Sequence, residues 1–266
     1  MNKLNKALYE IQSIEDLSIR DYLVNKIHPL IKFILTITYI SLVVSIDKYS
    51  IGQVIGMSIY PIILLITCDI SLKDTFKRLK IVLPFILLMG IFNPFFDNKV
   101  IFTINSIKIS AGVISMITLI VKGVLTILAS YLLIATTTID KICYSMDKIH
   151  LPKIFITEVL FIYRYITVLI KEGSRITEAY SLRAPNQKGI NYKVWGSLLG
   201  QLLLRSIDKA ESIYESMSLR GYSGKFYYSY NIEYNKKDYI YFIIWLAIFI
   251  TVRFFPILQI VGKIFI

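Results

Sequence analysis

The chain has 266 residues, of which 55% are hydrophobic and 18% charged, with a mean hydropathy of +0.61. Soluble domains average about 45–50% apolar and about 25% charged residues, so the composition excludes an ordinary soluble protein, and 12 Gly and 7 Pro exclude a collagen-like chain. The net charge of +12 indicates orientation in a membrane rather than nucleic-acid binding. We therefore expect an all-α membrane protein that binds the lipid bilayer and no nucleic acid.

Segment 1–27 is polar and has no continuous apolar run of the kind found in signal peptides. We expect it to be a cytoplasmic N-terminal segment. Its acidic residues lack a spacing suited to binding a metal ion and a phosphate group, so they are predicted to form the solvated face of a helix. These acidic residues are Glu10, Glu15, Asp16 and Asp21.

Five apolar runs are candidates for transmembrane helices, which need about 17 to 25 residues. Four lie in segment 28–135 and one in segment 239–266: His28–Ile46, Ile51–Thr67, Ile81–Phe96, Ala111–Ala135 and Tyr239–Leu258. Between the third and fourth runs, Phe102–Ile109 alternates polar and apolar residues about Asn105 and Ser106, which predicts a short extracellular hairpin.

Lys and Arg are concentrated in the connections on one side of these runs, which predicts a cytoplasmic N-terminus and an external C-terminus. Segment 136–238 then forms a cytoplasmic helical module. Within it Ile154–Ile170 is apolar enough to cross, but a crossing would place eleven basic residues outside and Glu158 and Arg164 in the bilayer. We expect this segment to stay on the cytoplasmic side, as a helix that is hydrophobic nearly all round because it is buried between the membrane and other protein.

An internal repeat lies in this module. Glu178–Ala184 recurs as Glu215–Gly221, thirty-seven residues later, each time at the end of a helix-compatible run. Pro185 is predicted to stop the first helix, and Gly221 is predicted to be the glycine that follows the C-cap of the second.

Each copy of the repeat ends by presenting an arginine, Arg183 or Arg220. Such a residue stabilises the end of its own helix by a few tenths to about 1 kcal/mol through the helix dipole. Alternatively, the two guanidinium groups bind carboxylates in equivalent acidic grooves of a two-fold or pseudo-two-fold partner. The repeat by itself favours neither interpretation.

The sequence resembles the transmembrane T component of energy-coupling factor (ECF) transporters, the EcfT/CbiQ family. In that family each arginine motif reads Ala-Arg-Gly at the end of a long cytoplasmic coupling helix. Here the arginines match and the flanking residues match only in part: Leu182-Arg183-Ala184 and Leu219-Arg220-Gly221. The resemblance also includes Asn93-Pro94, the connection from Thr136-Thr137-Thr138 to Leu151-Pro152, and Arg164-Tyr165.

The resemblance implies a non-catalytic coupling subunit of an ATP-driven importer in a bacterial plasma membrane. Its coupling helices would lie across two ATP-binding-cassette (ABC) ATPase subunits, a homodimer or a heterodimer, with each motif arginine bound to an acidic residue of one ATPase. Its membrane helices would hold a substrate-binding S component for a vitamin or a transition-metal ion. ATP and Mg²⁺ would bind to the partners, so the chain itself needs no cofactor.

No Walker A, HExxH, GxSxG or EF-hand pattern occurs, so we predict no catalytic and no metal-binding residue. Cys68 and Cys143 lack a CxxC spacing and are predicted to be buried small hydrophobic residues. Two alternatives stay open, a membrane-embedded enzyme and a self-contained secondary transporter. The first would be expected to show clustered carboxylates and the second inverted repeats around a midplane site.

Several other side chains have a structural and a functional interpretation. His28 and His150 are predicted to be interfacial rather than metal ligands. Lys122 and Arg253 lie inside predicted spans and are expected to face protein or water rather than lipid. For Lys122 the alternative is a place on the surface that meets the S component. One apolar helix face is expected to pack between helices or to contact the S component: Trp195, Leu198, Leu199, Leu202 and Leu203.

Overall fold

The computed structural model describes residues 3–22, 24–96, 100–104, 107–185, 187, 189–224 and 233–254. The chain divides into two compact units. We call Ser18–Thr138 with Ile232–Ile266 the bundle unit, and Met1–Leu17 with Ile139–Asn231 the arm unit.

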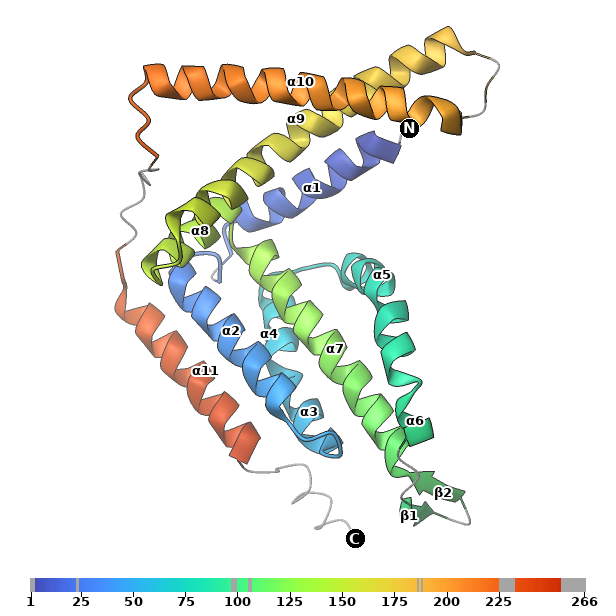
Figure 1. Ribbon diagram of the computed structural model, residues 1–266. Helices are drawn as coiled ribbons and strands as arrows, with labels where there is room; N and C mark the ends of the chain where they lie inside the picture. Colours follow the sequence, from blue (N-terminus) through green and yellow to red (C-terminus); the bar gives the residue numbers. More distant parts are fainter. Residues whose placement is uncertain are drawn as a thin grey trace. The chain divides into compact units, whose positions relative to one another are not determined.

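The bundle unit is built around α7 (Ala111–Thr136), a helix of 26 residues. Among the described residues, only α7 is both long and apolar enough to cross a membrane, and α2 and the α3–α4 pair are apolar but shorter. The predicted count of five spans therefore stays unconfirmed. Helices α2 to α6 pack against α7, and α11 packs against α2 and α3 (Figure 1). Their bounds are α2 Pro29–Ser45, α3 Ile51–Met57, α4 Ile59–Thr67, α5 Leu72–Gly90, α6 Asn93–Phe96 and α11 Lys236–Phe254.

Two predicted spans have other limits in the structure. The second is interrupted at Ser58, whose Oγ donates to the carbonyl of Ile55 at 2.6 Å, because a serine hydroxyl competes for backbone carbonyls. The third begins at Leu72 rather than Ile81. Residues 72–80, which lie before the third predicted span and include four Lys and Arg residues, are therefore the first part of α5. Asp74 in the first turn stabilises this helix through the helix dipole.

The predicted hairpin is present between α6 and α7. Strand β1 (Val100–Ile104) pairs antiparallel with β2 (Ile107–Ser110), so that Phe102 lies opposite Ile109. The turn residues Asn105 and Ser106 lie outside the described residues.

Aromatic residues form the centre of the bundle unit. Tyr39 of α2, Tyr60 of α4, and Trp245 and Phe249 of α11 have ring centroids between 4.7 and 5.9 Å apart. Tyr39 and Phe249 are almost completely buried. The Tyr39 hydroxyl donates to the carbonyl of Met57 at 3.0 Å, which satisfies a polar group inside the apolar core. These contacts hold α11 against helices from the beginning of the chain.

The two cations that we expected inside spans contact protein. Lys122 Nζ donates to the carbonyl of Val44 at 3.2 Å and also to that of Ile46. Arg253 Nη2 donates to the carbonyl of Ser45 at 3.0 Å. The last carbonyls of a helix have no partner within the helix, so both side chains stabilise the end of α2. Their predicted contact with protein is confirmed.

His28 also has a structural position, at the start of α2. Its Nδ1 accepts the N–H of Leu30 at 3.2 Å, and its own backbone N–H donates to Asp238 Oδ1 at 3.1 Å. Its ring stacks on Tyr234 with centroids 4.0 Å apart. Over the described ranges, no group of three or more His, Cys, Asp or Glu residues is placed to hold a metal ion.

In the described residues of the arm unit there are four helices: α1 (Lys3–Ile19, to Leu17 in this unit), α8 (Ile139–Lys148), α9 (Lys153–Arg183) and α10 (Tyr192–Leu219). Glu10, Glu15 and Asp16 are exposed on α1, as predicted, whereas Asp21 is exposed but follows the end of that helix. Cys143 in α8 and Cys68 in the bundle unit are buried, also as predicted. After α8 the chain turns at His150, which has a φ of 65° and lies at the surface.

Ile154–Ile170 forms part of one continuous helix of 31 residues, α9. The expected burial is between the membrane and other protein, so it stays a prediction. Ile156 is buried, but Ile154 is 76% and Ile162 is 66% exposed. Helix α8 packs against α9, and the apolar side chains that stay exposed are the ones that contacts with the membrane or other protein would cover.

Candidate functional site: two helices that end in arginine

The first arginine motif closes α9. The helix ends at Arg183, and Ala184 is its C-cap with a φ of −129°. The Ala184 N–H donates to the carbonyl of Tyr180 at 3.0 Å, and Pro185 has no N–H with which to continue the ladder. The predicted stop at the proline is confirmed. Because φ is negative here, this motif has no need of the glycine that the family pattern places after the arginine.

The Tyr180 hydroxyl makes hydrogen bonds to two residues that follow Arg183, and we call this contact the Tyr180 latch. Tyr180 Oη donates to Gln187 Oε1 at 2.5 Å and accepts the N–H of Asn191 at 3.4 Å. Asn191 Oδ1 in turn accepts the N–H of Lys193 at 3.1 Å and caps α10. The end of α9 and the start of α10 are therefore connected through one tyrosine.

The second arginine motif closes α10 in a different way. Leu219 is the last residue of the helix, Arg220 is the C-cap, and Gly221 has a φ of +80°. The N–H of Tyr222 donates to the carbonyl of Met217, and that of Gly221 to the carbonyl of Ser218, both at 3.0 Å. This is a Schellman motif, and it favours glycine at the left-handed position. The predicted role of Gly221 is confirmed.

Both motifs point outward. Leu182 is 82% and Leu219 is 90% exposed, Arg183 and Arg220 are exposed, and Ala184 is half-buried. Within the part of the chain that the structure describes, neither arginine makes an ion pair. The ends of α9 and α10 lie on opposite sides of the point where the helices cross (Figure 1). The structure therefore presents two separate apolar and cationic tips rather than one pocket.

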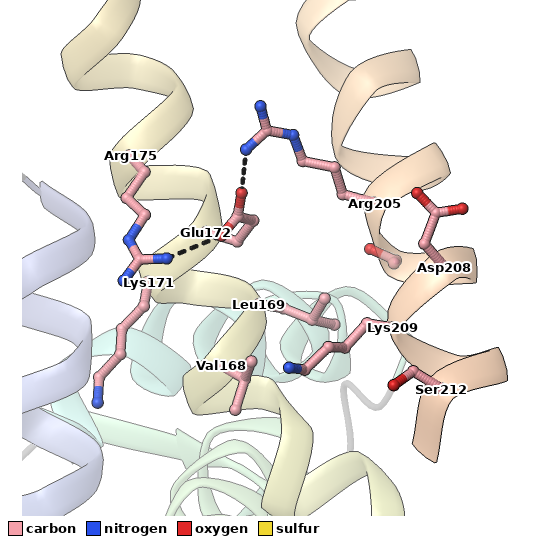
Figure 2. A pocket seen from close by; sticks show the side chains of 10 residues that line it. Val168, Leu169, Lys171, Glu172, Arg175, Arg205, Asp208, Lys209 and Ser212 are labelled. Atoms are coloured by element: carbon pink, nitrogen blue, oxygen red, sulfur yellow. Dashed lines mark hydrogen bonds and ion pairs between the residues drawn. The ribbon is translucent and has the colours of Figure 1, made fainter. Parts of the chain in front are cut away.

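The helix crossing contains an ion pair that the sequence analysis missed. Glu172 of α9 accepts a hydrogen bond from Arg205 of α10 through one carboxylate oxygen. Its other oxygen accepts from Arg175, one turn along α9, at 3.5 Å (Figure 2). The hydrogen bond from Arg205 holds the pKa of Glu172 below its usual range. Sequence spacing could have found the pair with Arg175, but the pair with Arg205 depends on how α10 returns across α9.

Next to this crossing, α1, α9 and α10 surround an apolar cavity of about 310 Å³. Leu4 of α1 contributes to its wall, and Ser174 Oγ donates to Asn5 Oδ1 at 3.2 Å between α9 and α1. Most of the apolar face that we singled out lines this cavity, so inter-helix packing is one of its roles. The residues of that face in the lining are Trp195, Leu198, Leu199 and Leu202.

Substitution at the two helix ends should have unequal effects. Gly221→Val is expected to destabilise the last turn of α10 by about 1–2 kcal/mol, because a β-branched residue is strained in the left-handed region. Ala184→Val at the corresponding place after Arg183 should have little effect, since φ is −129° there. Hydrogen exchange of the two helix ends, followed by mass spectrometry, measures the difference. Equal protection in both variants would contradict the assigned cap geometry.

Comparison with known proteins places this architecture in a family. The family model CbiQ, described as cobalt transport protein, matches residues 22–228. An uncharacterized protein of Methanocaldococcus jannaschii is 27% identical over 203 residues, which cover 73% of this chain and 69% of that protein. A protein of Methanocorpusculum labreanum, named as a fused cobalt transport protein CbiMQ, is 36% identical over 95 residues, 35% of this chain and 16% of that protein.

A second uncharacterized protein of Methanocaldococcus jannaschii is 31% identical over 119 residues, 44% of each chain. Because the family model spans most of the sequence, the chain belongs to the CbiQ family of cobalt transport proteins, which is the EcfT family. The family consists of membrane transport components and is not a known catalytic family. Both arginine motifs and the whole of α9 and α10 lie inside the matched region, whereas α1 lies before it.

Proposed function

We propose that this chain is the scaffold and coupling subunit, the T component, of an ATP-driven ECF importer. Arg183 and Arg220, at the ends of α9 and α10, each bind an acidic groove on one of two ABC ATPase subunits. The bundle unit holds a substrate-binding S component in the membrane. Movement of the ATPases during ATP binding and hydrolysis reaches the S component through the two helices.

The observation that carries the proposal is the repetition of one helix ending on two long helices of the arm unit. A guanidinium group at a helix end can donate two parallel hydrogen bonds to a carboxylate. Interaction with the helix dipole would explain the arginines but not the leucine that precedes each one at 82% and 90% exposure. An exposed apolar side chain beside an arginine is typical of a protein contact, because interface cores are enriched in arginine and depleted of other charges.

The proposed topology follows the distribution of charge. Five spans in segments 28–135 and 239–266, with segments 1–27 and 136–238 in the cytoplasm, place most of the Lys and Arg residues inside. This arrangement brings both arginine tips to the side of the membrane where ATP is available, so ATP and Mg²⁺ bind to the partner subunits.

The substrate class is a vitamin or a transition-metal ion. The description of the family and the name of the Methanocorpusculum labreanum relative both give cobalt, so Co²⁺ is the first substrate to test. Specificity would reside in the S component, which must recognise the ion or vitamin before release.

The test is to tag the full chain, solubilise it gently from its native membrane and identify the co-purifying proteins by mass spectrometry. We expect two ABC ATPase subunits, identical or different, and a small hydrophobic S protein whose ligand is then determined. A chain that purified alone and transported a solute, or turned one over, without ATPases would contradict the proposal. It would favour a secondary transporter or a membrane enzyme instead.

A further inference from the structure

Helix α10 lies on the surface of the arm unit. None of its described residues is buried, although a helix fixed by packing normally buries an apolar stripe. Its orientation relative to α9 therefore depends on a few contacts. These are the apolar cavity wall, the Tyr180 latch at one end, and the ion pair at the crossing.

Glu172 lies among four cations where α9 and α10 cross. An open pocket of about 510 Å³ lies between α9 and α10. Four cations and one further carboxylate line it beside Glu172: Lys171 and Arg175 from α9, and Arg205, Lys209 and Asp208 from α10. Glu172 faces Arg205 across the gap between the helices and also contacts Arg175 (Figure 2). Its carboxylate therefore pairs with a cation on each of the two basic helix faces.

The crossing is also a pivot for the two tips. Arg183 follows Glu172 by eleven residues, and Arg220 follows Arg205 by fifteen. With a rise of 1.5 Å per residue, the helix segments from the crossing to the Arg183 and Arg220 tips are about 17 Å and about 22 Å long. A rotation of α10 by about 10° at the crossing would move the Arg220 tip by about 4 Å. Such a shift exceeds the tolerance of a hydrogen bond between a guanidinium group and a carboxylate.

We propose that Glu172 and Arg205 form a clamp that fixes the angle at which α10 crosses α9, and so sets the separation of the Arg183 and Arg220 tips. Both are positioning residues, because their effect on a partner would come from where they place Arg183 and Arg220. The consequence for ATPase spacing rests on the proposed function, whereas the clamp is a property of this chain alone.

The clamp can be tested by a distance between spin labels on Glu178→Cys and Glu215→Cys, equivalent exposed positions of the repeat outside the arginine motifs. The full chain in lipid nanodiscs is used. The native Cys68 and Cys143 are buried, and burial raises the pKa of the Cys143 thiol to about 11, which keeps it unreactive. The unsubstituted clamp should give one narrow distance peak in pulsed electron paramagnetic resonance.

Glu172→Gln and Arg205→Gln are expected to lose the narrow peak, and Arg205→Lys, which keeps the charge, should retain it. Arg175→Gln removes the partner of Glu172 within α9, and Lys209→Gln removes a charge from the same pocket wall, so both controls should also retain the peak. A narrow peak in Arg205→Gln, or equal broadening in Arg205→Gln and Arg175→Gln, would overturn the clamp.

A pH profile separates positioning from general packing. The pKa of Glu172 is depressed, so the clamp is present above the ordinary pKa of about 4.3 and is lost as the pH falls through the lowered value. The peak of the unsubstituted clamp should therefore broaden in acid. The peak of Glu172→Gln should already be broad and should not change with pH, even though this variant keeps the Asp208 carboxylate. A profile that is identical in the two proteins would contradict the role of Glu172.

The two proposals fail separately, because this distance is measured without ATPases. If Glu172→Gln loses the peak while ATPase association survives the loss of both tip arginines, the clamp stands and the proposed coupling role fails.

Discussion

Arg183→Glu combined with Arg220→Glu is expected to abolish association of the chain with its ATPase subunits while leaving membrane insertion intact. Truncating one partner of a buried charge pair at an interface costs about 2–5 kcal/mol, and charge reversal adds repulsion from the acidic groove. Two such losses exceed what a complex of ordinary affinity tolerates. Each single variant should associate more weakly than the wild type, and unequally if the two ATPases differ. Co-purification in mild detergent is the measurement.

The matched control reverses two charges at the other ends of the same helices. Lys153→Glu with Lys193→Glu changes the net charge by the same amount, and both lysines are exposed in the first turns of α9 and α10. Carboxylates there are favourable to the helix dipole, so ATPase association should persist. Arg183→Gln with Arg220→Gln removes the charge without placing an acid at a helix C-terminus, and should still lose the complex. Undiminished association in the two Arg183 and Arg220 double variants would defeat the coupling role.

Phe249→Ala is expected to be the most destabilising single substitution in the aromatic centre of the bundle unit. Phe249 is 1% exposed and contacts Tyr39, Tyr60 and Trp245. In a water-soluble core, Phe→Ala costs about 3–5 kcal/mol. Lipid is as apolar as the side chain, so the free energy of transfer from water to the core contributes little here. The loss of packing that remains is expected to cost about 2–3 kcal/mol.

Thermal unfolding of the purified chain in one detergent, followed by tryptophan fluorescence, measures this loss. Phe254→Ala is the matched control, because Phe254 lies on the same helix and is 75% exposed. It should leave the midpoint nearly unchanged. Equal midpoints for the two variants would show that α11 is not held to α2 and α4 by its aromatic face.

Local chemistry decided how much of the candidate site could be predicted. Pro185 and Gly221 mark the ends of α9 and α10 because one lacks a backbone donor and the other accepts a positive φ, and both effects act within a few residues. The same holds for the hairpin before α7, where polar and apolar residues alternate on either side of a turn signal. The residues at both helix ends can therefore be predicted from the sequence alone.

Contacts between segments far apart in the sequence had to come from the tertiary structure. The start of α5 at Leu72, the approach of α11 to Tyr39, and the caps that Lys122 and Arg253 place on α2 depend on which helices meet.

By itself the sequence determined a helical, membrane-type chain with a repeated arginine ending, because hydrophobic content, periodicity and helix capping are local properties. Only the tertiary structure decided that Glu172 meets Arg205 across thirty-three residues and that the two tips lie on opposite sides of that crossing (Figure 1). A carboxylate among several cations has many candidate partners in a sequence, and the path of the backbone selects one of them.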